Sequence, residues 1–240
     1  MIHIVIVRDS MIFQSILKQT EAKKVPLSGI SYQVFSQGNI RIIGEYDVSI
    51  EEVLVSVVKE LNPDTVFFLG ESYPVSDEKR GGDIVLPNVF FSYNNEIESM
   101  EIGQEKMDSL ISEPLFLEHY PLQGDYDFES FGLSVGGIHV SGVWNEAIED
   151  FRIRLRLVYE NDTFDSDIYT FVQKASELGI QEKTYPVAYT KTEDIKSEAK
   201  NVWSIVQFII GSVDPDLISP ETDEEQGGEK EEWMDGSSEE

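Results

Sequence analysis

The sequence predicts a single α/β domain whose mixed, mostly parallel sheet is flanked by helices, followed by an acidic disordered tail. A chain of 240 residues is long enough to bury one sizeable core. Segments with the composition of buried strands alternate with segments of helical periodicity. Residues 214–240 carry twelve acidic residues and one lysine, with too few apolar side chains to offset the entropy of ordering. We therefore expect one domain over residues 1–213 and a disordered tail over residues 214–240.

The N-terminal part of the domain predicts a strand, a helix, a hairpin and a second helix. The first strand is a continuous apolar run, as in strands buried on both faces, and both helices repeat apolar residues at helical spacing. A Ser-Gln-Gly-Asn stretch between the next two apolar runs is typical of a hairpin connection. The expected strands are Ile2–Val7, Ile30–Phe35 and Ile40–Ile43, and the expected helices are Ser10–Thr20 and Ser49–Leu61.

A buried strand is predicted at the centre of the domain, over Thr65–Leu69. An Asn-Pro-Asp sequence ends the preceding helix, and Gly70 closes the strand. A polar connection then leads through Gly82 to a further strand at Ile84–Leu86, which Pro87 stops. A helix, a buried strand and a loop at its carboxyl end form the kind of unit whose loops hold ligands in α/β sheets.

The second half of the chain alternates strands and helices again. One predicted strand contains a pair of glycines, and Gly179 is a stop signal for the helix that precedes it. The expected strands are Val89–Phe91, Leu133–Gly142 and Thr184–Tyr189, and the expected helices are Gly103–Ser112, Asn145–Tyr159, Asp165–Leu178 and Thr192–Ile210.

The charge and composition argue against several classes of site and partner. A formal net charge of −28 disfavours nucleic acid or an anionic membrane as a direct partner, because phosphate binding relies on Lys and Arg. It also disfavours a peptidyl-tRNA-hydrolase-like enzyme on a related sheet. The lack of cysteine and the presence of only three histidines disfavour a metal site, and we expect no cofactor. The apolar N-terminal run is too short to span a membrane, so we expect a cytoplasmic protein.

The central motif resembles the purine nucleoside and uridine phosphorylases and the methylthioadenosine/S-adenosylhomocysteine nucleosidases. It consists of Pro63-Asp64, the apolar strand, Gly70, a connection, and Gly82-Asp83-Ile84-Val85. The order of the other elements extends the resemblance from Ile2 to about Ile210. It implies a nucleoside phosphorylase-like fold, a homo-oligomer and a nucleoside ligand. The chain departs from the family at the loop after the strand, where Glu-Ser-Tyr-Pro replaces small residues.

The resemblance also implies residues that bind substrate. In the family the central strand runs into a loop that approaches the substrate, and Gly70 is the first residue of the equivalent stretch here. Ser141 lies in a Gly-Gly-Ile-His-Val-Ser-Gly stretch that resembles the family's "G-x-x-x-S-G-D" strand. Asp165 and Asp167 occupy the positions of the family's "V-E-M-E", in which the second Glu binds the ribose hydroxyls. Without the family, both aspartates are explained as acids at a helix N-terminus. By the same reasoning His139 is a hydrogen-bonded histidine of the core or surface.

The position of the catalytic acid is where the chain departs most from the family. The resemblance places an Asp that protonates the purine at Thr190, and a hydroxyl cannot act as an acid near neutral pH. A shift in register would instead bring Glu193 or Asp194 into the site. Only Asp9 lies near the expected water-activating Glu.

The phosphate site that the resemblance implies is also incomplete. Arg8 and Arg41 lie near the positions of the family's two phosphate-binding arginines, but no Gly-rich first turn is present.

These departures favour a non-catalytic protein of phosphorylase fold that serves in binding or assembly. The alternative is an enzyme that cleaves the N-glycosidic bond of a nucleoside through a rewired site, whose carboxylates would be Asp167, Asp165 and one of Glu193 or Asp194. In the tail, Trp233 and Met234 stand between acidic residues, a composition that suits a segment ordering on a basic-surfaced partner protein.

Overall fold

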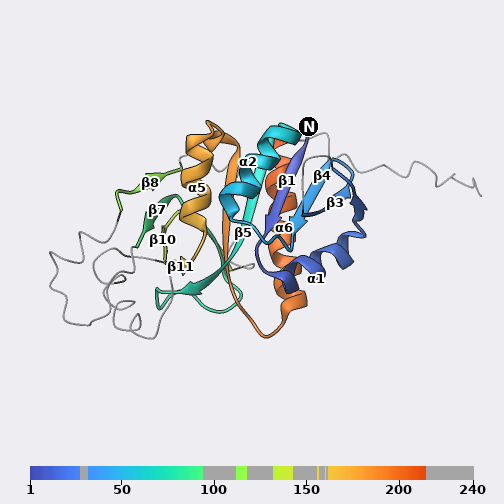
Figure 1. The fold of residues 1–240 in the computed structure, drawn as a ribbon. Coiled ribbons are helices and arrows are strands. Elements are labelled where there is room, and N and C mark those ends of the chain that lie inside the picture. The colour runs from blue at the N-terminus through green and yellow to red at the C-terminus, as the bar shows by residue number, and fades with distance from the viewer. Residues whose placement is uncertain are drawn as a thin grey trace, which may run out of the picture.

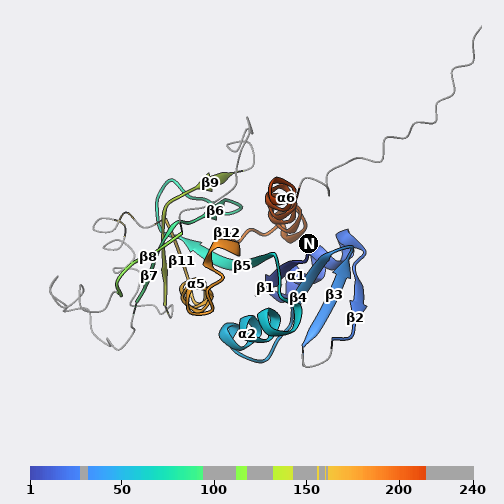
Figure 2. The ribbon, with the colours of Figure 1, turned by 90° about the horizontal axis from the view of Figure 1, so that it is seen from above.

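The computed structural model describes residues 1–27, 32–93, 112–117, 132–142, 156, 160 and 162–214. Within these residues a mixed sheet is covered by helices on both faces (Figures 1 and 2). The α/β architecture predicted from the sequence is therefore confirmed. The helices expected at Gly103–Ser112 and Asn145–Tyr159 lie almost entirely outside the described residues, as do tail residues 215–240.

The centre of the sheet consists of parallel strands built from the apolar runs. Strand β1 (His3–Val7) pairs in parallel with β4 (Ile40–Gly44) and with β5 (Thr65–Pro74). Strand β12 (Thr184–Thr190) also pairs in parallel with β5. Every residue of β1 and β12 is buried, as expected for strands covered on both faces.

Shorter strands extend the sheet at both ends. The predicted hairpin is formed by β3 (Gln33–Gln37) and β4, and a strand that was not predicted, β2 (Lys23–Val25), pairs with β3. Its Lys-Lys-Val sequence has no strand pattern of its own, so its conformation depends on its partner. The remaining strands are β6 (Ile84–Leu86), β7 (Val89–Ser92), β8 (Leu115–Phe116), β9 (Leu133–Val135), β10 (Ile138–Ser141) and β11 (Thr163–Asp165).

The strand predicted over Leu133–Gly142 is two strands, so that prediction is wrong. Gly136 and Gly137 have φ values of +85° and +114°, which L side chains rarely adopt, and the chain bends there. Strand β9 pairs with β6, whereas β10 pairs with β7 and β11. At Gly137 an added Cβ would lie only 2.3 Å from Asp162 Oδ2.

Strand β5 is longer than predicted, because Gly70 does not end it. The strand runs on to Pro74. Its register with β12 continues as far as Ser72, and Tyr73 and Pro74 then pair with β11 in antiparallel orientation. Neighbouring strands therefore fix a segment whose polar sequence suggested a loop.

Two layers of helices bury the two faces of the sheet (Figure 2). Helices α1 (Ser10–Thr20) and α6 (Ile195–Val213) pack together on one face, and α2 (Ile50–Leu61) and α5 (Ile168–Glu177) pack on the other. Helix α5 begins at Ile168 rather than at the predicted Asp165, because Asp165 is the last residue of β11. A short 3-10 helix at Gln181–Lys183 leads into β12. None of the helices in the described ranges is both long and apolar enough to cross a membrane.

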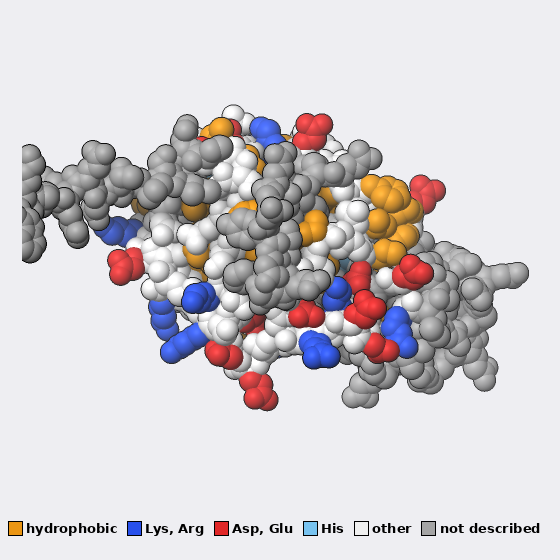
Figure 3. Space-filling view, turned by 180° about the vertical axis from the view of Figure 1, so that it is seen from behind, with side chains coloured by type: hydrophobic (Ala, Val, Ile, Leu, Met, Phe, Trp, Pro, Cys, Tyr) orange, Lys and Arg blue, Asp and Glu red, His pale blue; other side chains and the backbone are white. Residues whose placement is uncertain are grey.

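The surface of the domain carries both signs of charge. Acidic and basic side chains are interspersed over the described surface seen in Figure 3. Of the formal charge of −28, a net −11 belongs to residues 214–240 alone.

The contact between β4 and α1 yields a prediction about stability. A Cβ added at Gly44 would lie 2.5 Å from Cδ2 of the buried Phe13, so Gly44→Ala forces the ring to move. We expect the free energy of unfolding to fall by about 1–3 kcal/mol, measured by urea denaturation. As a control, Val55→Ala, at a side chain that is 39% exposed, is expected to change it by no more than about 0.5 kcal/mol. Equal midpoints for the two variants would contradict the close packing at Gly44.

Candidate functional site

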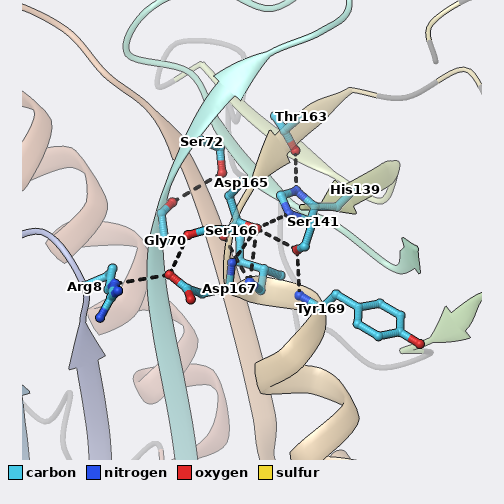
Figure 4. Close-up of polar contacts among 11 residues, drawn as sticks. Arg8, Gly70, Ser72, His139, Ser141, Thr163, Asp165, Ser166, Asp167 and Tyr169 are labelled. Atoms are coloured by element: carbon cyan, nitrogen blue, oxygen red, sulfur yellow. Dashed lines mark hydrogen bonds and ion pairs between the residues drawn. The ribbon is translucent and has the colours of Figure 1, made fainter. Parts of the chain in front are cut away.

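A pocket lies at the carboxyl edge of the sheet, where β1 ends and β5 passes on toward β11. Ligands in open α/β sheets bind beyond the carboxyl ends of the strands. The pocket has a volume of about 270 Å³. It is lined by Arg8, Gly70, Glu71, Tyr73, Gly142, Phe164, Asp165, Ser166 and Asp167. Figure 4 shows its polar part.

Gly70 allows the start of α5 to approach β5 closely. An added Cβ would lie 2.9 Å from Cγ1 of Ile168 and 3.0 Å from Oδ2 of Asp165. Glycine is therefore needed for packing at this point, whether or not a ligand binds. The predicted substrate-binding residue Gly70 does line the pocket, and its contact with a ligand stays a prediction.

The Asp165 carboxylate connects β10, β11 and α5 (Figure 4). Its Oδ1 accepts hydrogen bonds from Nε2 of His139 at 2.9 Å and from Oγ of Ser141 at 2.6 Å. The same oxygen lies 3.1 Å from the backbone amides of Asp167 and Ile168. Asp165 thus accepts hydrogen bonds at the N-terminus of α5, as expected from the sequence without the family.

The two other residues of this network are also held by internal contacts. His139 is fully buried, and its Nδ1 lies 2.8 Å from Oγ1 of Thr163, which confirms the expectation of a hydrogen-bonded histidine. In the neutral tautomer that donates from Nε2 to Asp165, Nδ1 accepts from the Thr163 hydroxyl. Ser141 Oγ also accepts from the amide of Tyr169 at 2.8 Å. Ser141 therefore holds the start of α5, and substrate binding by Ser141 and Asp165 stays a prediction.

Asp167 is the aspartate that faces the pocket, where it pairs with Arg8. The Arg8 Nε lies 3.1 Å from Asp167 Oδ2, and Ser166 Oγ donates to the same oxygen at 2.7 Å. The Arg8 side chain is 47% exposed and that of Asp167 is 22% exposed, so solvent or a ligand can reach both. Although Asp167 precedes α5 directly, its side chain makes no capping hydrogen bond to the helix.

Glu71 is a second carboxylate of the pocket and was not predicted from the sequence. Lys191 Nζ lies 3.2 Å from both of its oxygens. Burial raises the pKa of Glu71, Lys191 partly offsets this, and the nearby Asp9 raises the pKa further. Asp9 itself caps α1, since its Oδ1 accepts from the amides of Met11 and Ile12 at 2.8 Å. The signal that was available is that Glu71 directly follows the glycine of the central motif.

Thr190 is buried and takes no part in the pocket. Its hydroxyl donates to the carbonyl of Arg80 and lies 3.1 Å from that of Asp83. The backbone of Thr190 exchanges hydrogen bonds with the same connection, because its amide donates to Asp83 and its carbonyl accepts from Gly82. Thr190 therefore holds the β5–β6 connection against β12.

The two acids proposed as replacements do not reach the Asp167 pocket. Glu193 lines a separate, shallow cavity together with Gly81, Lys191, Thr192 and Ile195. Asp194 caps α6, where its Oδ1 accepts from the amide of Ser197 at 3.2 Å. The structure thus brings Asp167 together with Glu71 rather than with Glu193 or Asp194.

Other predicted groups lie away from the pocket or outside the described residues. Arg41 Nη1 donates to Ser36 and Gly38 at the β3–β4 hairpin. Trp233 and Met234 lie outside the described residues. In the described ranges no three side chains of His, Cys, Asp or Glu come together as a metal site would require.

Comparison with solved structures identifies the fold. A futalosine hydrolase mutant of Helicobacter pylori matches with a TM-score of 0.63 and 11% identity over 86% of this chain and 99% of that chain. The 5'-methylthioadenosine nucleosidase of Arabidopsis thaliana matches with 0.62 and 12% over 88% and 96%. A putative 5'-methylthioadenosine/S-adenosylhomocysteine nucleosidase of Francisella philomiragia matches with 0.62 and 16% over 86% and 99%.

The chain therefore has the nucleoside phosphorylase-like fold of these nucleosidases, as the resemblance implied. No protein-family model matches the sequence, and no curated protein matches it. At this level of identity the likeness concerns the fold, and what the site does has to be argued from its residues.

The Asp165 network yields a second prediction about stability. Asp165→Asn is expected to lower the free energy of unfolding by about 2–4 kcal/mol, because it removes the negative charge that accepts four hydrogen bonds at Oδ1 and places an amide donor at the Oδ2 position, 3.1 Å from the backbone amide of Ile168. Thermal and urea unfolding measure the change, with Asp47→Asn at an exposed position as the matched control. An Asp165→Asn protein as stable as the control would show that the network does not hold α5.

Proposed function

We propose that this protein binds a nucleoside, or a ligand with the same ribosyl group, in the carboxyl-edge pocket and does not cleave its N-glycosidic bond. The observation that carries the proposal is the contrast between Asp167 and Thr190. Asp167 turns a carboxylate toward the pocket, where it is suited to accept hydrogen bonds from ribose hydroxyls. Thr190, at the position where the resemblance expects the acid, uses a neutral hydroxyl within the protein.

The lining of the pocket supports a ligand of this class. Polar groups of Arg8, Ser166 and Asp167 gather on one side, and Tyr73 and Phe164 add aromatic surface. A few polar groups beside aromatic ones are typical of small-molecule sites. Tyr73 is 46% exposed, so its ring is accessible to a ligand. Because the similar structures are nucleosidases, nucleosides are the first ligands to test.

The proposal predicts binding without turnover. Titration calorimetry with adenosine, 5'-methylthioadenosine and uridine is expected to give saturable binding for at least one, while chromatography shows no released base. Asp167→Ala is expected to weaken that binding at least about tenfold, because it removes a charged acceptor. The exposed Asp47→Ala is the matched control. Turnover near the rate of ordinary enzymes, about 1–10 s⁻¹, would overturn the non-catalytic function.

A second candidate function, hydrolysis of the N-glycosidic bond, is favoured by Glu71 alone. A carboxyl group whose pKa is raised by burial and by a neighbouring carboxylate is suited to act as a general acid. Glu71 would donate its proton to the leaving base, and water would add to the sugar carbon and lose a proton to Asp9.

The two functions differ in what Glu71→Gln does. If base is released, Glu71→Gln should lower the rate at least about 100-fold, whereas Thr190→Val should leave it within about twofold. The rate should also fall as pH rises through the raised pKa of Glu71, because only the protonated acid is active. Release that persists unchanged in Glu71→Gln would exclude this candidate.

The expectations of a homo-oligomer and of a tail that binds a basic-surfaced partner through Trp233 and Met234 stay predictions. They would add an assembly role to the proposed ligand binding without requiring the pocket.

A further inference from the structure

The hydroxyl of Tyr46 is a buried polar group that the proposed function leaves unexplained. Tyr46 follows β4, is only 8% exposed, and packs in the core on the α2 side of the sheet. Its hydroxyl has no hydrogen-bond partner among the described residues. An unpaired buried hydroxyl destabilises a folded protein, so the Tyr46 hydroxyl would gain from a donor that moved within reach.

Arg8 is a charged residue that contacts the ring of Tyr46. Its guanidinium lies over the Tyr46 ring, with Cζ 5.6 Å from the ring centroid. It also lies close enough to the hydroxyl to counter part of the pKa rise, but without a hydrogen bond of normal geometry. Burial raises the pKa of Tyr46 to about 12, so the phenol stays neutral and keeps its lone pairs as acceptors.

The same guanidinium is paired with Asp167. The pair is partly exposed, so water screens it and breaking it costs little. A ribosyl ligand needs the Asp167 oxygens for its own hydroxyl groups. The ligand therefore competes with Arg8 for one carboxylate.

We infer that Arg8 is a displaceable counter-ion, which leaves Asp167 when a ligand with vicinal hydroxyl groups binds and then donates to the hydroxyl of Tyr46. This inference rests on the proposed function, because it assumes that Asp167 receives the ligand. Tyr46 is a positioning residue in this scheme, since it acts through Arg8 and does not touch the ligand. While Arg8 is paired with Asp167, the Tyr46 hydroxyl has no hydrogen-bond partner among the described residues.

The exchange also defines the ligand class. A neutral diol can donate to Asp167 in place of the guanidinium, and the displaced guanidinium then donates to the Tyr46 hydroxyl. Each group keeps a hydrogen-bond partner, and the ion pair that is lost is a partly exposed one. A ligand lacking one of the two hydroxyls satisfies fewer acceptor positions of Asp167 after expelling Arg8. We therefore expect ribonucleosides to bind more tightly than their 2'-deoxy counterparts.

A double-mutant cycle on ligand affinity tests the exchange. The wild type, Tyr46→Phe, Arg8→Gln and the double variant are titrated with whichever of adenosine, 5'-methylthioadenosine or uridine the wild type binds. Tyr46→Phe is expected to weaken binding about three- to tenfold in the wild type. In the Arg8→Gln background the same change is expected to have less than about a twofold effect, because no guanidinium is left to donate a hydrogen bond to the Tyr46 hydroxyl.

Tyr189→Phe is the matched control. Tyr189 also has a buried hydroxyl without a partner among the described residues, but it lies in the other core cluster, on the α1 and α6 side. Tyr189→Phe is expected to leave ligand affinity unchanged. Neither Tyr46→Phe nor Tyr189→Phe should have a melting temperature below that of the wild type, because each removes an unpaired buried hydroxyl.

The remaining outcomes each contradict a different claim. If Tyr46→Phe weakens binding equally with and without Arg8, Tyr46 contacts the ligand and the exchange is wrong. If Tyr46→Phe has no effect on affinity, the hydroxyl has no role in binding and the inference fails while the proposed function stands. If the wild type binds none of the three nucleosides, the proposed function fails and the inference with it.

Discussion

The pocket depends on one buried negative charge, the carboxylate of Asp165. A carboxylate in an apolar interior is stable only where donors replace the water it has lost. Here a histidine, a serine and two backbone amides provide those donors from β10 and α5. The start of α5 is thereby fixed against β5, where only a glycine at position 70 leaves room. The direction in which Asp167 faces follows from this arrangement, since Asp167 lies between the anchoring residue and the helix.

The apolar pattern of the sequence was sufficient to predict those strands and helices whose own residues supply a clear apolar face. Strands β1 and β12 and helices α1, α2 and α6 each contain enough apolar residues at one spacing to indicate their type. Strands such as β2 and β11 could not be predicted, because three residues carry no measurable period and pair only once a neighbour is in place. The polar end of β5 was read as a loop for the same reason, since its partners come from distant parts of the chain.

The site was less predictable than the fold, because function depends on which side chains share one edge. Asp167 and Gly70 could be located by motif position, and both line the pocket. Glu71 follows the same motif glycine but was missed, because a glutamate at the end of a predicted strand is ordinary until Lys191 and Asp9 are known to lie near it. Conversely, Glu193 and Asp194 lie close to the predicted acid in sequence, yet one faces another cavity and the other caps a helix. Two residues that are close in sequence have predictable side-chain directions relative to each other only when both lie in the same helix or strand.

The low identity to the nucleosidases is consistent with a fold maintained by packing alone. Buried strands and amphipathic helices tolerate exchange among apolar residues of similar volume, so the backbone persists while identity falls to 11–16%. Partly exposed polar residues at the carboxyl edge, such as Asp167, are under no such packing constraint, unlike the buried Asp165. Thr190 illustrates the consequence: a residue that stabilises the β5–β6 connection stands where the resemblance expects an acid. The hydrogen bonds of the Thr190 hydroxyl are made within the protein, so a shared architecture does not by itself carry a shared chemistry.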